Sequence, residues 1–386
     1  MATKQDLLEK LIKQPLFFDG VDFDELVNPS TALTFDDLRC ALKRVFNVSE
    51  TALGTESNAT TGPMGWFNRY MTRRRQKAYF AKINAGFVGQ AHHRVIVAEG
   101  DFWFQFIGRD IINWLDDQDQ YAIYSMSYAG DWLANILFEE KYIEELSIHK
   151  PSVFLVSGGG NDLVGVNRLA IMTCLNPHSF LPLRHTNEQK LLNAGCTPEQ
   201  AQQIMDVQRH ILPDFYAFLL ILKCQYYLLF NSLRKAADLQ TMAIITQGYD
   251  YAIPHAGVRW GLWYQPLVNS AVGSGKWLSQ PLMIRGIKDK IIQRSIIMAM
   301  IFELNEMFIS LAKRSEFPYL YHVDSWGNAD DHDWFDELHL KPLAFKRVAT
   351  AYENCLHSHF AHMVSTPARS KNSSYHFWAK PRLLTQ

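Results

Sequence analysis

Five short apolar runs constrain the fold of this chain more than any other feature. Each run is followed by small or acidic residues, and segments with helical spacing separate them. The runs are Arg94–Ala98, Tyr121–Met126, Ser152–Val156, Met242–Thr246 and Tyr319–Val323. Strands that are apolar throughout are typical of a parallel sheet covered on both faces. Because parallel crossovers are right-handed, the pattern predicts a doubly wound α/β domain with three layers and five parallel strands.

The rest of the chain divides around this domain. Residues 1–90 read as a helical N-terminal extension, and residues 91–364 as the α/β domain. Within that domain, residues 165–240 are mostly helical and exceed what the sheet requires. We therefore expect a helical insertion that forms a lid or flank over the site. The loop-forming composition of residues 54–63 indicates a linker, and we expect residues 365–386, rich in Ser, Lys and Pro, to be a loosely ordered tail.

Composition excludes some classes of protein. The chain has 386 residues, 48% of them apolar and 20% charged, which is typical of a soluble globular protein. Its net charge of -1 lacks the basic surplus of a nucleic-acid-binding protein. The only dense basic run is Arg73-Arg74-Arg75-Gln76-Lys77. We interpret it as a solvated helix face, with a phosphate or membrane-surface patch as the alternative.

Cysteine use and apolar stretches bear on location. The five cysteines are scattered, odd in number and never at metal-ligand spacing, which favours reduced thiols and a cytoplasmic location. The N-terminus lacks the pattern of a secretory signal. The most apolar stretch, Phe215 to Phe230, contains Lys223 and Gln225. It is too short and too polar to span a bilayer, so we expect a buried helix and no membrane span.

Residues able to do chemistry follow each of the five apolar runs. The blocks are Gly100–Trp103, Ser127–Asp131, Ser157–Asp162, Gln247–Tyr251 and Asp333–His339. Ligands of open parallel sheets bind beyond the carboxyl ends of the strands. Because one block follows each strand, we expect the five blocks to meet at one edge of the sheet and to form a site.

This series of blocks resembles the SGNH, or GDSL, hydrolase family. It is most similar to a bacterial subgroup whose first block reads Glu-Gly-Asp-Ser-Trp, and here that block reads Glu99-Gly100-Asp101-Phe102-Trp103. The resemblance covers residues 94 to about 350 and is strongest at Phe154–Leu163. It implies a flavodoxin-like fold and the hydrolysis of esters, without a cofactor or a metal ion.

The resemblance also implies roles for single residues. Phe102 stands where the family carries its nucleophilic serine. Gly130, through its backbone N–H, and Asn161, through its side-chain amide, would form an oxyanion hole with the backbone N–H of residue 102. His339 would be the general base, oriented by Asp336. The other residues expected at the pocket are Asp101, Trp103, Gly159, Gly160, Asp162, Tyr249 and Asp250.

Elementary chemistry gives reasons for the same roles. An Asp-x-x-His spacing at a helix start can bring carboxylate and imidazole into contact and select one tautomer of the imidazole. A glycine run lets backbone donors approach a developing charge closely. Taken alone, Asp336 and His339 are more simply a helix cap and a surface histidine, and Phe102 is more simply a core aromatic at a strand end; the other blocks, above all Gly159–Asp162, favour the catalytic interpretation. His92–His93 and Asp330–Asp333 offer metal-ligand types, but loops of this composition are more simply solvated surface.

The phenyl ring at the nucleophile position leaves three functions open, because such a ring cannot attack a carbonyl. The first is a hydrolase-like protein that has lost most or all ester cleavage and binds a small ester or acylated ligand in its pocket. The second is a working esterase in which the Asp336–His339 pair activates water, or in which Ser125, Ser127 or Ser157 supplies a hydroxyl. The third is a scaffold that binds a protein partner through the helical extension or insertion.

Overall fold

The computed structural model describes residues 2–31, 33–46, 62–90, 92–106, 108–178, 186–255, 277–365 and 376–378. Most of the linker expected at 54–63 and of the tail expected at 365–386 lies outside these residues. The described part contains one parallel sheet with the strand order β2-β1-β3-β4-β5-β6. The strands are β1 Arg94–Glu99, β2 Tyr121–Ser125, β3 Val153–Val156, β4 Ala243–Gln247, β5 Leu320–Asp324 and β6 His376–Trp378.

The sheet confirms the doubly wound α/β prediction and extends it by one strand. All five apolar runs form strands, each within one residue of the expected bounds. The sixth strand, β6, was not expected, because it lies in the segment assigned to the tail. It pairs in parallel with the outer edge of β5, where His322 lies opposite His376.

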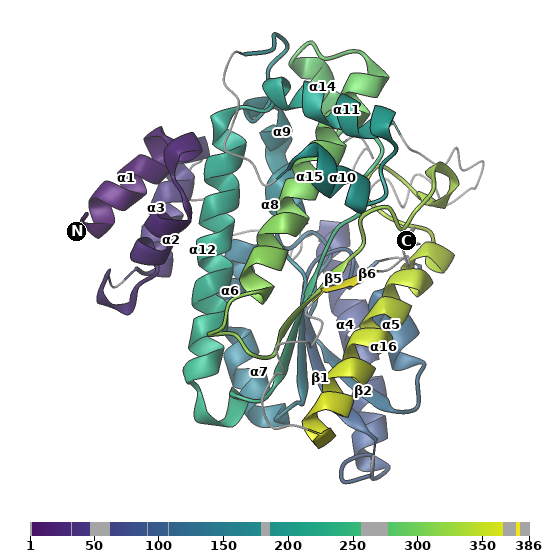
Figure 1. Ribbon diagram of the computed structural model, residues 1–386. Coiled ribbons are helices and arrows are strands. Elements are labelled where there is room, and N and C mark those ends of the chain that lie inside the picture. Colours follow the sequence, from purple (N-terminus) through teal and green to yellow (C-terminus); the bar gives the residue numbers. More distant parts are fainter. Residues whose placement is uncertain are drawn as a thin grey trace.

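Helices cover both faces of the sheet (Figure 1). One face carries α4 Gly62–Asn84, α5 Ile111–Asp116 and α16 Pro342–Ser365. The other carries α6 Leu133–Glu139, α7 Lys141–His149, α12 Pro213–Lys235 and α15 Lys290–Ala312. Every residue of β2 to β5 is buried between these layers, which explains why the strands are continuously apolar.

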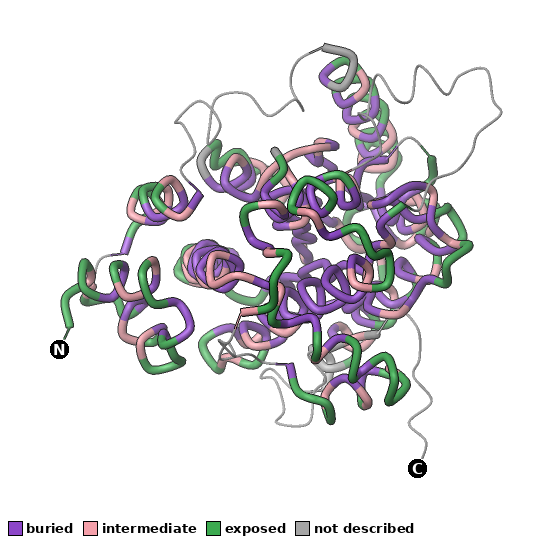
Figure 2. The backbone as a smooth tube through the Cα atoms, turned by 90° about the horizontal axis from the view of Figure 1, so that it is seen from above, coloured by how far each residue is buried: buried purple, intermediate pink, exposed green. Residues whose placement is uncertain are grey.

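Two helices of the described part, α12 and α15, are long and apolar enough to cross a membrane by length and composition. Most of the apolar stretch of each is buried inside the molecule, as in core helices of globular proteins. The stretch from Phe215 to Phe230 lies within α12, so its prediction as a buried helix is confirmed. Seen from above, buried residues fill the centre of the molecule and the inward sides of the outer helices (Figure 2).

Three short helices precede the α/β layers. They are α1 Lys4–Lys13, α2 Gly20–Leu26 and α3 Phe35–Phe46. The first two begin with capping boxes, formed by Thr3 with Asp6 and by Asp19 with Asp22. The helices pack on α12 and not on the sheet (Figure 1). The fourth helix of the expected extension, α4, is by contrast part of a sheet-covering layer and contacts β2.

The segment expected as an insertion, residues 165–240, has two parts. Its second part is α12, which connects β3 to β4 as an ordinary crossover helix. Its first part contains the short helices α9 Arg168–Ile171, α10 Glu188–Asn193 and α11 Pro198–Val207. Here α11 packs on α15, and α9 packs on α14 Ser279–Ile284 (Figure 1).

Candidate active site

A cavity with about 40 Å³ of room for the centres of water-sized molecules lies where the loops after the strands meet. Residues of the first, third, fourth and fifth blocks line it together with apolar side chains of α8 Gly160–Val164, α9 and α15. Its lining is Asp101, Phe102, Trp103, Gly160, Asn161, Leu163, Val164, Leu169, Tyr249, Asp250, Ala252, Leu278, Ile297, Met300, Ile301, Leu338 and His339. The structure thus brings Asn161 and His339 to one site.

The loop between β5 and α16 holds Asp336 and His339. Trp334 and Leu340 form an antiparallel bridge across this loop, and the Phe335 N–H donates to the His339 carbonyl at 2.7 Å. The Asp336 Oδ1 accepts from the His339 backbone N–H at 2.8 Å and lies 2.7 Å from the ring Nδ1. The pair therefore forms in a closed loop that ends before α16, and not at a helix start as the spacing suggested.

The imidazole of His339 is fully buried among aromatic rings. Phe106 stacks on it with ring centroids 4.3 Å apart. Phe102 and Trp277 meet it edge-on, with centroid distances of 4.7 and 5.8 Å. Because Nδ1 contacts Asp336, the other nitrogen, Nε2, is the one available to a reactant, and it is buried without a hydrogen-bond partner in the described structure.

The Phe102 ring fills space beside both His339 and Gly130. Gly130 has a φ of +86°, and a methyl group added there would lie 3.6 Å from Cε2 of Phe102. Phe67, Ala129 and Trp277 complete the apolar cluster around the ring. The phenyl group thus stands against the backbone that the resemblance assigns to the oxyanion hole.

Asn161 lies in the first turn of α8 and lines the cavity. Its Nδ2 donates to the carbonyl of Asp131 at 2.8 Å, which orients the amide. An amide nitrogen carries two N–H groups, so one donor remains for a ligand after this contact.

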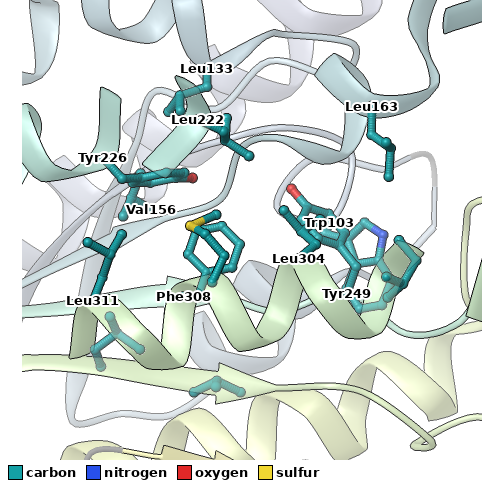
Figure 3. Close-up of a cluster of buried hydrophobic side chains, with 14 of the residues drawn as sticks. Trp103, Leu133, Val156, Leu163, Leu222, Tyr226, Tyr249, Leu304, Phe308 and Leu311 are labelled. Atoms are coloured by element: carbon teal, nitrogen blue, oxygen red, sulfur yellow. The ribbon is translucent and has the colours of Figure 1, made fainter. Parts of the chain in front are cut away.

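Asp101 ties three loops together. Its carboxylate accepts from the Tyr249 hydroxyl at 2.6 Å, from the Ser157 hydroxyl at 2.8 Å and from the Trp103 N–H at 3.1 Å. Burial raises the pKa of Asp101, while the hydrogen bond from Tyr249 opposes that rise. Figure 3 shows the Trp103 and Tyr249 rings beside each other, and their centroids lie 5.5 Å apart.

Asp162 and Asp250 hold backbone groups. The Asp162 Oδ2 accepts from the Leu133 N–H at 2.8 Å, and Asp162 is not part of the cavity lining. Asp250 accepts from three backbone N–H groups, two of them in the loop after β5. Burial raises the pKa of Asp162, and it raises that of Asp250 to about 7. The structure thus gives these carboxyls positioning contacts around the expected pocket.

Close packing explains the glycines after β3. Gly159 has a φ of +104°, and a Cβ there would lie 2.9 Å from Leu222. A Cβ on Gly160 would lie 2.7 Å from the Tyr249 ring. Of the two, only Gly160 lines the cavity. Both positions exclude larger side chains, the first also because of its backbone conformation.

The structure does not bring the alternative hydroxyls to His339. Ser125, Ser127 and Ser157 are fully buried, and none lines the cavity. Gln247 is also buried and accepts from the Tyr352 hydroxyl at 2.7 Å, away from the cavity lining.

The carboxylates of the Asp330–Asp333 loop are of a type that can bind metal ions, but two of them form ion pairs with arginines instead. Asp331 pairs with Arg294, and Asp333 pairs with Arg347. In the part of the chain that the structure describes, no group of three or more His, Cys, Asp or Glu side chains is placed to hold a metal ion.

Sequence reasoning missed the walls of the site. Phe106 and Trp277 enclose His339, and Ile297, Met300 and Ile301 of α15 line the cavity. No pattern in the sequence separates apolar helix residues that face a cavity from those that face the core. Glu337 carried a usable signal, since it lies between Asp336 and His339 in the chain. It is buried and accepts from the backbone N–H groups of Leu278 and His255.

Comparison with known proteins found little. No family model matches the chain, and no curated protein matches it. Among solved structures, a candidate GDSL-like lipase from Parabacteroides merdae is similar to it at 12% sequence identity and a TM-score of 0.29. The match covers 68% of this chain and 94% of that one. The function of this chain therefore has to be inferred from its own residues.

Proposed function

We propose that the chain is an SGNH hydrolase-like protein that binds a small ester or acylated ligand and has lost most or all serine-type ester cleavage. The observation that carries the proposal is the contact between Phe102 and His339, with ring centroids 4.7 Å apart. A serine hydrolase needs a hydroxyl within hydrogen-bond reach of its histidine. Here a phenyl ring lies beside an intact His339–Asp336 pair.

The loss of a nucleophile has a large expected effect. In a serine protease it lowers turnover roughly a million-fold, and the remaining rate comes from binding and the oxyanion hole. The hydrogen-bond donors expected in the oxyanion hole are compatible with such a remaining function. The side chain of Asn161 keeps one N–H, and the backbone of Gly130 keeps a φ of +86°.

The cavity indicates the class of ligand. Aliphatic side chains from three helices, such as Leu163, Leu169 and Ile297, line a large part of it. Asn161 and His339 are among its few polar groups. Such a lining favours a ligand with an apolar chain and one polar group, as in an acyl ester.

A second candidate is hydrolysis by water that the Asp336–His339 pair activates. The buried Nε2 of His339, which has no hydrogen-bond partner in the described structure, supports this candidate. It needs a water molecule beside the Phe102 ring, and that need places it second.

The test compares three proteins on nitrophenyl esters of short and medium chain length. They are the parent, Phe102→Ser and Phe102→Ala, and the alanine variant removes the ring without adding a nucleophile. We expect no measurable turnover in the parent or in Phe102→Ala. In Phe102→Ser we expect turnover, together with labelling by a fluorophosphonate probe that His339→Ala abolishes.

Other outcomes identify the competing functions. Turnover in the parent that disappears with His339→Ala would establish water activation. A folded Phe102→Ser protein that neither turns over esters nor takes up the probe would contradict a preserved hydrolase site and would leave the scaffold function.

A further inference from the structure

One side of α4 collects positive charge and aromatic rings. The residues of this α4 face are Trp66, Arg69, Tyr70, Arg73, Arg74 and Lys77. All are exposed, and they surround a shallow hollow. Trp66 and Tyr70 are 64% and 53% exposed, and their rings stack at a centroid distance of 5.7 Å. Large exposed rings beside several cations mark an interaction surface.

Helical geometry aligns these residues. Trp66, Tyr70, Arg73 and Lys77 follow one another at spacings of four, three and four residues, so they form one stripe along the helix. At about 1.5 Å of rise per residue the stripe is about 16 Å long. A flat surface can therefore contact all of its side chains at once.

Three cations of this face, Arg73, Arg74 and Lys77, are the ones on which the charge argument rests. Arg73, Arg74 and Lys77 form no ion pair with the described residues. Two other cations of α4 do form such pairs, since Arg75 contacts Asp110 at 2.5 Å and Lys82 contacts Asp116 at 2.9 Å. Because the chain as a whole has a net charge of -1, the positive charge is a local property of the α4 face.

We propose that the α4 face docks on the surface of a bilayer that contains anionic lipids. Trp and Tyr prefer the headgroup region of a membrane, and Arg and Lys are attracted to anionic lipids. A helix that lies flat on the surface presents both kinds of side chain to the bilayer at once.

A single-stranded nucleic acid fits the α4 face less well. Its bases would need rings spread along a groove, whereas Trp66 and Tyr70 stack on each other. The docking proposal stands whether or not the cavity binds an acyl ligand.

The same helix reaches the candidate active site from its other side. Phe67 belongs to the apolar cluster around Phe102. The Asn68 side-chain amide forms hydrogen bonds with both the N–H and the carbonyl of Ala129. A bilayer held by the α4 face would therefore lie against the helix that supports the Gly130 loop.

The test is co-sedimentation of the full chain with phosphatidylcholine vesicles, prepared with and without phosphatidylserine. We expect binding to the anionic vesicles only, and we expect molar salt to release it because salt screens exposed charges. Removing Arg73 and Arg74 as Arg73→Gln/Arg74→Gln should weaken partitioning roughly 30-fold, from two basic residues of about 1 kcal/mol each.

A matched control separates the α4 face from general charge. Lys288→Gln/Lys290→Gln removes the same charge from exposed positions at the start of α15 and should leave binding unchanged. Trp66→Ala should weaken binding at constant charge, with an unchanged melting temperature as evidence of folding.

Three results would overturn the proposal. They are equal binding to neutral and anionic vesicles, equal losses in the two double variants, and tight binding of an oligonucleotide to the α4 face without vesicle binding.

Discussion

At the scale of single residues, we expect Glu99 to make the stability of the fold depend on pH. It ends β1 beside the first block and is 7% exposed. Its Oε1 accepts from the Gly100 N–H at 2.9 Å. Burial raises the pKa of Glu99 well above its ordinary value, and the charge of nearby Asp131 raises it further. Folding therefore holds a proton on this carboxyl that the unfolded chain releases at lower pH.

The sign of the pH effect follows from that shift. A carboxyl with a raised pKa in the folded state stabilises the fold below its unfolded pKa of about 4.3, and this contribution is lost as the pH rises toward the folded value. We expect Glu99→Gln to unfold in urea like the parent at pH 4.5 and to be the more stable protein at pH 8. The exposed Glu144→Gln should show no such difference between the two pH values. A parent as stable as Glu99→Gln at pH 8 would refute the raised pKa.

At the scale of elements, the two sides of α4 differ in burial and in charge pairing. Arg75, from the basic run, is 6% exposed and donates to Asp110, to Asn113 and to the carbonyl of Phe104. Its sequence neighbour Arg74 is exposed. The basic run Arg73–Lys77, which we interpreted from the sequence as a solvated helix face, thus contains one buried residue, Arg75. Its ion pair with Asp110 holds α4 against the loop before α5.

Removing the inward cation leaves Asp110 buried without its charged partner. We expect Arg75→Gln to lower the free energy of unfolding by about 3–5 kcal/mol, the usual cost of breaking a buried pair from one side. Arg74→Gln should change it by less than about 0.5 kcal/mol, as is usual for exposed positions. Urea unfolding of both variants measures this difference, and similar values for the two would contradict the assigned orientation of α4.

Helices and strands could be predicted where their packing leaves a recognisable pattern of apolar residues in the sequence. Both faces of the sheet are covered, so the strands β1 to β5 appear in the sequence as apolar runs. The edge strand β6 has three residues and left no such run. The crossover helix α12 was grouped with the insertion, because a long apolar helix has the same pattern whether it covers a sheet or a pocket.

Site residues followed the same rule. His339 and Asp336 are recognisable because their spacing reports a direct contact, which the structure shows at 2.7 Å. Asp101 was expected at the pocket, and its bonds to Tyr249 and Ser157 join loops 148 and 56 residues away in the chain. Such contacts depend on how the strands are ordered in the sheet, which local sequence does not encode.

At the scale of the whole molecule, the cavity lies between helix α15 and the loops that follow the strands. Helix α15 packs on β5, α11 and α12, and its residues Ile297, Met300 and Ile301 line the cavity. A ligand there would contact the core helix and the loops after the strands at the same time. Because a ligand that binds only the folded state stabilises it, binding should appear as a change in global stability.

Filling the cavity tests this coupling. We expect a medium-chain ether, which cannot be hydrolysed, to raise the melting temperature of the parent, since a ligand at 100 times its Kd contributes about 2.7 kcal/mol. Ile297→Trp places an indole in the apolar wall and should abolish the ligand-induced shift, even where overpacking costs about 1–3 kcal/mol of its own. Ile291→Trp, at an exposed position of the same helix, should keep the full shift. Differential scanning fluorimetry with each variant measured against its own ligand-free state separates the two effects. An unchanged shift in Ile297→Trp would place the ligand outside this cavity.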